Sequence, residues 1–289
     1  MALLLLACAC RRETVFARPD APGAVDTAGA APRRVVALAP SLTEIAFAIG
    51  AGPLIVGVDD FVEFPVEATS LPRVGGLLNP NFEKILSLRP DLVIMVKTFR
   101  TAADRLQRAG VRTAIIPAES LSDLDAAVAS VGDATHRTDG AARLRRRIRD
   151  ELAAVEASVR GRPRPRTAFV LDRRPGSLTD IYVAGRASFL AELVEMAGGQ
   201  NVFDDVKPGA ARVGVEELLR RAPQVILDST KDPDAEAVWA QLGPLPGGER
   251  RRVISVWEHR IAVPGPRVGL AARRLAGWLH PSDGAPDGG

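Results

Sequence analysis

The feature that most constrains the fold of this chain is one long helix, predicted over Thr138–Arg160, with a complete chain segment on either side. Thr138 and Asp139 are suited to cap its first turn, and Gly161 with Pro163 to end it. Its apolar positions, spaced three or four residues apart, are Ala141, Leu144, Ile148, Leu152, Val155 and Val159. Such a helix measures on the order of 34 Å, about the diameter of a small domain. It is therefore either an ordinary surface helix or a link between two lobes.

The segment before this helix alternates short apolar strands with helices. Strands are predicted at Arg34–Ala39, Leu54–Val58, Asp91–Val96 and Thr113–Pro117, and helices at Leu42–Ile49, Phe82–Leu88, Ala102–Ala109 and Leu121–Ala134. Ser41 is the predicted N-cap of the first helix, and Glu44 three residues later completes a capping box. Because the strands are continuously apolar, they indicate a parallel sheet covered by helices on both faces.

The segment after the long helix repeats this alternation. Strands are predicted at Thr167–Leu171, Val225–Asp228 and Val253–Val256, and helices at Phe189–Ala197, Val215–Arg221, Ala235–Leu242 and Val268–Leu279. We therefore predict an α/β protein with two lobes of mainly parallel sheet joined by a single long α-helix. The predicted divisions are a signal, lipid anchor and tether (1–32), an N-terminal lobe (33–137), a linker helix (138–162), a C-terminal lobe (163–281) and a disordered tail (282–289).

Composition restricts the class of function. The 289 residues are 46% hydrophobic and 25% charged, which is enough apolar material for a full core. The formal charge of +3 arises from interspersed basic and acidic residues, and only 4% of residues are aromatic, so nucleic-acid binding is not favoured. The three histidines, at 136, 259 and 280, lack ligand spacing, so neither a metal site nor a resident cofactor is predicted.

Motifs of catalysis are not found in the sequence. Gly50 and Gly52 precede a predicted strand rather than follow one, so they do not form a dinucleotide loop. There is no Gly-x-Ser-x-Gly motif and no phosphate-binding loop. We therefore predict that the chain is not an enzyme. A cytosolic α/β metal-cofactor-handling protein or enzyme remains as a less favoured alternative.

The N-terminus has the pattern of a bacterial lipoprotein signal that ends at Cys8. An apolar run, Met1–Ala7, precedes Cys8, and Arg11–Ala31 is rich in Ala, Pro, Gly and Arg. Acylation of Cys8 would attach a soluble body to the membrane through lipid alone, in the periplasm or at the outer face of the cytoplasmic membrane. The run is short and lacks a basic flank, which leaves open an upstream start or a cytosolic protein with an apolar N-terminus.

A weak internal repeat relates the two lobes. Residues 83–86 (EKIL) are followed by Pro90, and residues 216–219 (EELL) by Pro223, in each case seven residues after the first glutamate. Each of these glutamates, Glu83 and Glu216, falls in the first turn of a helix, where the helix dipole favours an anion. One such residue would be ordinary helix-start chemistry. Two at matched positions predict a pair of exposed carboxylates that dock a partner.

Seven short segments together give the chain a specific resemblance. They are RVVALAPSLT (34–43), LIVGV (54–58), LPRVGG (71–76), NPNFEKIL (79–86), RPDLVI (89–94), AGGQNVF (197–203) and PGPR (264–267). In this order they resemble the periplasmic substrate-binding proteins of ABC importers for cobalamin, ferric siderophores and haem, from Arg33 to about His280. The resemblance implies two Rossmann-like lobes joined by one rigid helix, with the ligand held in a cleft between them.

The same resemblance implies a function. It is that of a monomeric solute receptor that binds a corrinoid such as cobalamin and delivers it to the transmembrane permease subunits of an ABC importer. A ferric siderophore or haem is the alternative ligand. Glu83 and Glu216 fall on the two lobe-tip glutamates of the family, which pair with arginines of the permease.

Candidate ligand contacts follow the predicted strands, because loops at the carboxyl ends of parallel strands form α/β sites and aromatic rings suit a large flat ligand. The candidates are Phe61, Phe64, Leu77, Arg173, Arg174, Tyr182, Trp257, His259 and Arg267. Leu77 stands where the cobalamin receptor of the comparison has an aromatic residue. Arg173 and Arg174 could instead grip carboxylates of a siderophore or haem. Core packing for Phe61 and Phe64, and a solvated loop for the two arginines, are the alternatives.

Overall fold

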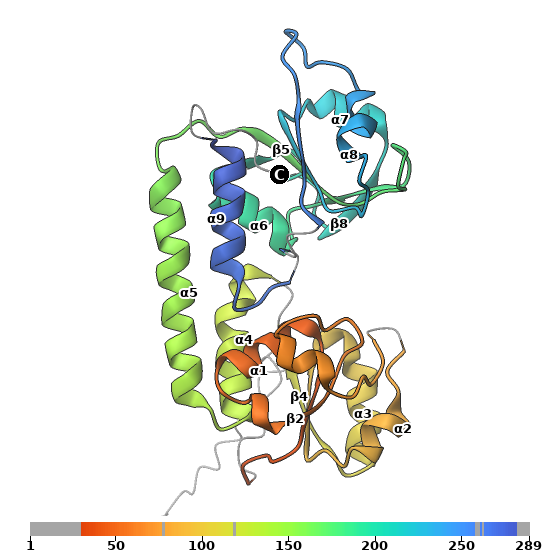
Figure 1. The fold of residues 1–289 in the computed structure, drawn as a ribbon, viewed down its shortest axis with the longest axis vertical. Helices are drawn as coiled ribbons and strands as arrows, with labels where there is room; N and C mark the ends of the chain where they lie inside the picture. The colour runs from red at the N-terminus through yellow and green to blue at the C-terminus, as the bar shows by residue number, and fades with distance from the viewer. Residues whose placement is uncertain (1–29, 77–78, 118–119, 258–260, 262, 282–289) are drawn as a thin grey trace, which may run out of the picture.

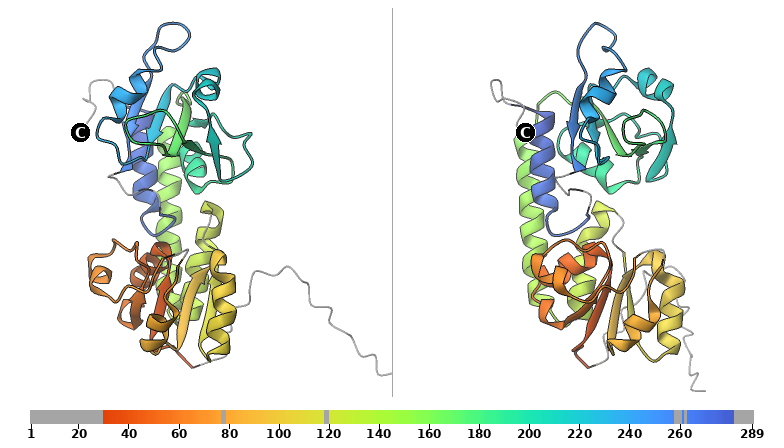
Figure 2. Two further views of the ribbon diagram at one scale, coloured as in Figure 1. Left: turned by 90° about the vertical axis from the view of Figure 1, so that its right-hand side faces the viewer. Right: turned by 45° about the vertical axis from the view of Figure 1, so that its right-hand side comes forward.

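The computed structural model describes residues 30–76, 79–117, 120–257, 261 and 263–281. Two α/β lobes are connected by α5 (Thr138–Val159), which runs along one side of both lobes (Figure 1). Turned views show the two lobes stacked along this helix (Figure 2). The predicted fold of two α/β lobes joined by one long helix is therefore confirmed. Among the helices of these described residues, none is both long and apolar enough to cross a membrane.

The N-terminal lobe contains a parallel sheet of four strands in the order β2-β1-β3-β4. The strands are β1 (Val35–Leu38), β2 (Ile55–Val58), β3 (Leu92–Val96) and β4 (Arg112–Ile116), and the helices are α1 (Pro40–Ala48), α2 (Phe82–Ser87), α3 (Arg100–Arg108) and α4 (Leu121–Ala134). Val35 and Ala37 of β1 enter one hydrophobic core, whereas Val36 and Leu38 enter another. Both faces of the sheet are therefore covered, as continuous apolar strands require.

The C-terminal lobe contains a mixed sheet in the order β10-β9-β5-β6-β8, with β7 paired to β5. The strands are β5 (Arg166–Asp172), β6 (Ile181–Ala184), β7 (Gln200–Asn201), β8 (Ala210–Val213), β9 (Val225–Asp228) and β10 (Arg252–Ser255), and the helices are α6 (Phe189–Met196), α7 (Val215–Arg221), α8 (Ala235–Ala240) and α9 (Val268–Leu279). Strands β5, β7, β9 and β10 run parallel to one another, whereas β6 is antiparallel to both of its neighbours, β5 and β8.

Three of these strands, β6, β7 and β8, are absent from the sequence prediction. β7 is only two residues long, and β8 lies at one edge of the sheet with every residue exposed or half-buried. Neither strand carries the continuous apolar run that marks a buried strand. Tyr182 is consequently part of β6, not of a loop that follows the first strand of the lobe.

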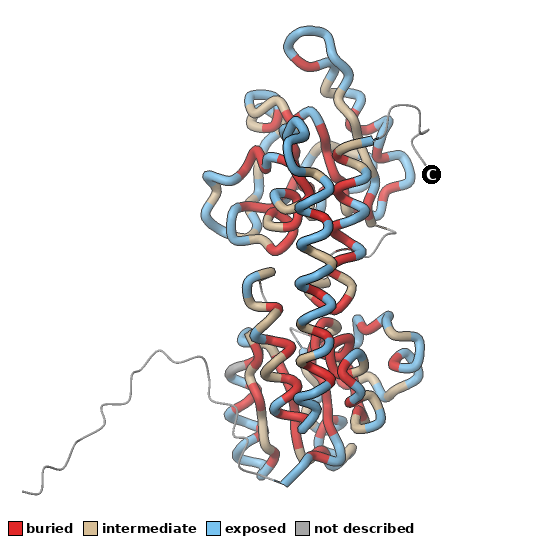
Figure 3. Tube along the Cα trace, turned by 90° about the vertical axis from the view of Figure 1, so that its left-hand side faces the viewer, coloured by how far each residue is buried: buried red, intermediate tan, exposed pale blue. Residues whose placement is uncertain are grey.

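One hydrophobic core continues from lobe to lobe along α5. Its buried residues include Leu144, Ile148 and Val155 of α5 together with Val35 of the first lobe and Leu275 of α9. Coloured by burial, α5 shows buried residues alternating with exposed ones along its length (Figure 3). The apolar stripe of the linker helix is therefore covered by residues of both lobes, and the helix packs against each of them.

The predicted helix caps at the starts of α1 and α5 are wrong. Helix α1 has Ala39 as its N-cap and begins with Pro40, whose fixed φ suits the first helical position. Ser41 and Glu44 therefore lie inside the helix and are buried, and they form no capping box. Helix α5 has Arg137 as its N-cap, without a side-chain hydrogen bond.

Candidate ligand and docking sites

The loop after β2 carries Phe61 and is held by two consecutive carboxylates. Asp59 is 2% exposed, and its Oδ1 accepts a hydrogen bond of 2.8 Å from the amide of Phe61. Burial raises the pKa of the Asp59 carboxyl above its usual range. Asp60 accepts a hydrogen bond of 2.9 Å from the amide of Gly75, a residue with a φ of 93°. These bonds fix the loop against the Gly75–Gly76 turn and leave the Phe61 ring 70% exposed.

Phe64 and Arg267, two of the predicted ligand contacts, lie together at a junction between the lobes. The guanidinium carbon of Arg267 lies 4.6 Å from the centre of the Phe64 ring. Arg267 also forms a bidentate ion pair with Glu44 of α1, at 2.6 and 3.0 Å, and Glu44 is 3% exposed. Arg267 therefore ties the start of α9 to the N-terminal lobe. From the sequence, Glu44 was predicted only as part of a helix cap and not as a partner of Arg267.

In the C-terminal lobe, Trp257 follows β10 and meets a residue that follows the neighbouring strand. The Nζ atom of Lys231, shortly after β9, lies 5.2 Å from the centre of the Trp257 ring. Because β9 and β10 are parallel neighbours, their carboxyl ends meet at one edge of the sheet. Lys231 is a neighbour of Trp257 that sequence reasoning missed. Its position after a buried strand was the available signal.

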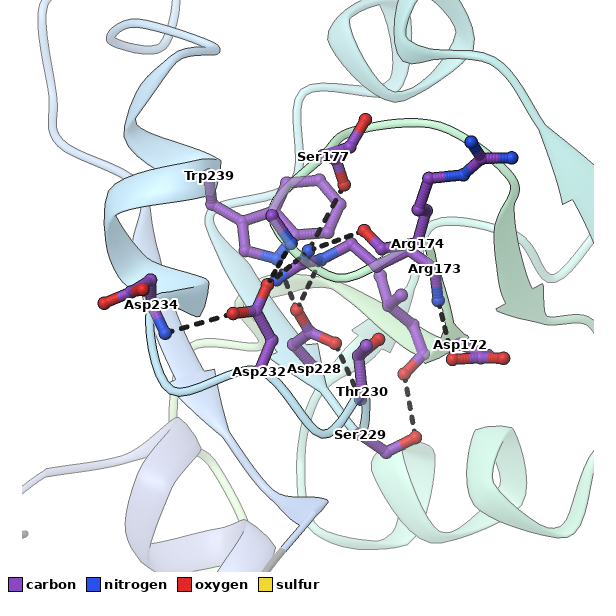
Figure 4. Close-up of polar contacts among 12 residues, drawn as sticks. Asp172, Arg173, Arg174, Ser177, Asp228, Ser229, Thr230, Asp232, Asp234 and Trp239 are labelled. Atoms are coloured by element: carbon purple, nitrogen blue, oxygen red, sulfur yellow. Dashed lines mark hydrogen bonds and ion pairs between the residues drawn. The ribbon is translucent and has the colours of Figure 1, made fainter.

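Arg173, a predicted ligand contact, is buried in an ion-pair cluster inside the C-terminal lobe rather than exposed after a strand. Its side chain is fully buried and pairs with Asp228 at 2.9 Å and Asp232 at 2.7 Å (Figure 4). The indole nitrogen of Trp239 donates to Asp228 at 2.7 Å. Arg173 also donates to the carbonyl groups of Arg174 and Ser177. Burying the guanidinium requires both carboxylates, since an unpaired charge in the core is strongly unfavourable.

Arg174 and Tyr182, by contrast, lie on the surface. The Arg174 guanidinium pairs with Asp180 at 2.9 Å, and Arg212 of β8 pairs with the same carboxylate at 2.5 Å. Tyr182 is 43% exposed and lies opposite Arg212 in the β6–β8 register. Arg174 and Arg212 therefore share one carboxylate, and a second carboxylate, Asp172, lies opposite Tyr182 in the β5–β6 register.

A groove of about 1260 Å³ lies between α4, α5 and α6. Its floor is apolar, with Leu124, Ile148 and Leu152, and its walls carry ion pairs such as that between Arg145 and Asp125. At one end the amide of Leu121 donates a 2.9 Å hydrogen bond to Glu192 of the other lobe. None of the described candidate ligand residues lines this groove. It was not foreseen, because it depends on how three helices meet.

Glu83 and Glu216 are exposed on α2 and α7, one helix in each lobe. Both helices lie on the side of the molecule remote from α5 (Figure 1). Neither glutamate forms an ion pair with any residue that the structure describes. The neighbouring Glu217 differs, because hydrogen bonds from Arg220 and Arg221 lower its pKa to about 2.

Three predicted positions, Cys8, Leu77 and His259, lie outside the described residues. Within the described residues, no group of three or more His, Cys, Asp or Glu side chains is placed to hold a metal ion.

The architecture is that of two stacked α/β lobes joined by one long helix. Residues 35–242 match the periplasmic binding protein family, and the chain belongs to that family. It is 26% identical over 255 residues to the vitamin B12-binding protein of Pectobacterium atrosepticum, covering 86% of this chain and 89% of the relative. The vitamin B12-binding protein of Vibrio parahaemolyticus is 29% identical over 238 residues, with coverages of 81% and 85%.

A solved structure shows the same architecture. The periplasmic haem-binding protein RhuT from Roseiflexus sp. RS-1, in its apo form, superposes with a TM-score of 0.72 at 27% identity. The alignment covers 84% of this chain and 96% of the Roseiflexus chain.

Proposed function

We propose that this chain is the extracytoplasmic solute receptor of an ABC importer and that it binds a corrinoid such as cobalamin. Residues 33–137 and 163–281 would form the two halves of the ligand site, joined by the helical linker 138–162. The observation that carries the proposal is the exposure of Phe61 on the first lobe and the placing of Trp257 at a strand end of the second. Rings on both lobes give a large flat ligand much contact area at little entropic cost. The vitamin B12-binding relatives supply the ligand class.

Titration of the purified chain with cyanocobalamin, haem and several ferric siderophores tests the ligand. Binding of cyanocobalamin should quench Trp257 fluorescence and release heat. Phe61→Ala and Trp257→Ala should each weaken affinity about tenfold or more, since large aromatic contacts dominate such sites. Met196→Ala is the matched control, because Met196 lines only the grooves beside α5 and α6. If the Met196 variant loses about tenfold in affinity and the two aromatic variants lose none, the ligand binds in the groove instead.

A haem or ferric siderophore is the second candidate. Lys231 at the Trp257 ring, and Arg174 with Arg212 beside Tyr182, are cations next to exposed or half-buried rings. Such pairs could hold ligand carboxylates. Binding of haem or a ferric siderophore without any heat or quench from a corrinoid would establish this alternative.

Delivery requires a permease, and we propose that Glu83 and Glu216 dock it. Two exposed carboxylates, one on each lobe, form no ion pair with any described residue and can meet cationic side chains of a partner. The lipid anchor is a further proposal: palmitate labelling at Cys8 in a strain that acylates lipoproteins would support it, and unlabelled protein would count against it. We propose a monomer with no catalytic role, located in the periplasm or at the outer face of the cytoplasmic membrane.

A further inference from the structure

The backbone geometry around the two docking helices is the same in both lobes. Each helix is followed by a residue with positive φ, which is Arg89 (48°) after α2 and Ala222 (42°) after α7. The amide of each donates to the carbonyl three residues earlier, at 2.9 Å to Leu86 and at 3.1 Å to Leu219. A proline comes next, and β3 and β9 both begin nine residues after the docking glutamate. The repeat is thus a repeat of structure as well as of sequence.

Within this unit, apolar residues at matched positions of the two lobes are buried or exposed to the same extent. Ile85 and Leu218 are 0% exposed and belong to the cores of their lobes. Leu86 and Leu219, the next residues, are 40% and 43% exposed. Each of these leucines lies three residues after its glutamate, and residues at that spacing share one helix face. Each lobe therefore presents a free carboxylate beside an exposed leucine.

Helix formation does not require leucine at these positions. Lysine, glutamate and glutamine have similar helix propensities and would hydrate the exposed face better. The core is already supplied by the neighbouring residue, Ile85 or Leu218. An exposed leucine at the same repeat position of both lobes is therefore an apolar side chain that the described residues of the chain leave uncovered. Apolar patches rimmed by polar groups are typical of protein interfaces.

We propose that Leu86 and Leu219 are contacts for the permease, and that the docking surface on each lobe is a Glu–Leu pair. This inference rests on the proposed docking role of Glu83 and Glu216. The partner it fits has, at two places, a cationic side chain beside an apolar one. The carboxylates set the orientation and the rate of association, because charges steer encounter over distance. The leucines hold the complex together, because apolar burial slows dissociation.

Binding kinetics to the permease distinguish these two parts. The full chain, loaded with cyanocobalamin, would be tested against the importer in phospholipid nanodiscs by surface plasmon resonance at low and physiological salt. Leu86→Ala and Leu219→Ala should each raise the dissociation constant about threefold and together about tenfold, because contacts in separate lobes act independently. The change should lie in the dissociation rate, with unaltered salt dependence. The Glu83→Ala and Glu216→Ala double variant should instead lower the association rate and flatten the salt dependence.

Leu270→Ala is the matched control, because Leu270 of α9 is 40% exposed and lies outside the repeat. It should bind the permease as wild type does. An alanine variant that loses cyanocobalamin affinity or its cooperative thermal transition is misfolded. In that case the test uses Leu86→Gln and Leu219→Gln, since glutamine keeps the helix and the size of the side chain.

The outcomes separate this inference from the docking proposal. If the leucine variants match Leu270→Ala while the glutamate double variant fails to dock, the leucine contacts are refuted and the docking role stands. If the glutamate double variant docks as wild type does, the docking role falls and the Glu–Leu pair falls with it.

Discussion

Replacing Arg173 with alanine tests whether the buried cluster around it stabilises the C-terminal lobe or serves the ligand. The guanidinium is fully buried between Asp228 and Asp232, at 2.9 and 2.7 Å. Its removal leaves both carboxylates in the interior without their cation. The Trp239 indole and the Gly176 amide remain as hydrogen-bond donors, but neither carries a full charge. Breaking a buried ion pair from one side costs about 3–5 kcal/mol, and we expect a loss of that size in the free energy of unfolding.

Urea unfolding followed by far-ultraviolet circular dichroism measures this loss. Arg174→Ala is the matched control, because the adjacent arginine pairs only at the surface, with an exposed side chain. Its unfolding free energy should stay within about 0.5 kcal/mol of wild type. Cyanocobalamin affinity measured below the unfolding transition should be the same in the Arg173 variant and in wild type.

The pH dependence provides a second readout. The Gly176 amide, and after it Arg173, hold the pKa of Asp232 below its usual range. A carboxyl with a lowered pKa in the folded state contributes stability above the unfolded pKa of about 4, and this contribution disappears as the pH falls through the folded pKa. The difference between wild type and Arg173→Ala should therefore be largest near neutral pH and shrink below about pH 4.

An unfolding free energy of Arg173→Ala within about 1 kcal/mol of that of Arg174→Ala would show that the buried cluster does not stabilise the lobe as expected. A tenfold or greater loss of ligand affinity in an otherwise stable Arg173 variant would return this residue to the ligand site.

Three further predictions concern the relation between the lobes and their partners. Glu83→Ala combined with Glu216→Ala should change the unfolding free energy by no more than about 1 kcal/mol per residue and leave ligand affinity intact, while uptake through the importer falls. Reversal of both charges to lysine should reduce uptake further, and normal uptake in that variant would exclude docking by these residues. Small-angle scattering with saturating cyanocobalamin should show almost no change in radius of gyration, because α5 and its core are continuous through both lobes. A large compaction would contradict a rigid linker. Glu44→Gln should lower the unfolding free energy by about 1–3 kcal/mol in urea, because Arg267 loses its counter-charge, and an unchanged midpoint would show that this pair does not stabilise the junction.

The arrangement of elements was accessible from the sequence because it follows from local periodicity. The predicted bounds of α4, α7, β9 and α9 agree with the structure residue for residue. Each of these elements has a regular apolar pattern and a clear stop, which are properties of neighbouring residues. Strand β6 and the edge strand β8 were missed because each is stabilised by pairing with the other, and the two strands come from separate segments of the chain.

The sequence by itself determined the two lobes, the long helix between them and the matched positions of Glu83 and Glu216. Only the tertiary structure decided how two adjacent, identical residues differ in burial and in charge pairing. Arg173 is buried in an ion-pair cluster, whereas Arg174 is exposed. Glu217 is paired with two arginines, whereas Glu216 has no ion pair among the described residues. The physical reason is that burial and charge pairing depend on groups brought together from distant segments, and a local pattern does not contain those groups.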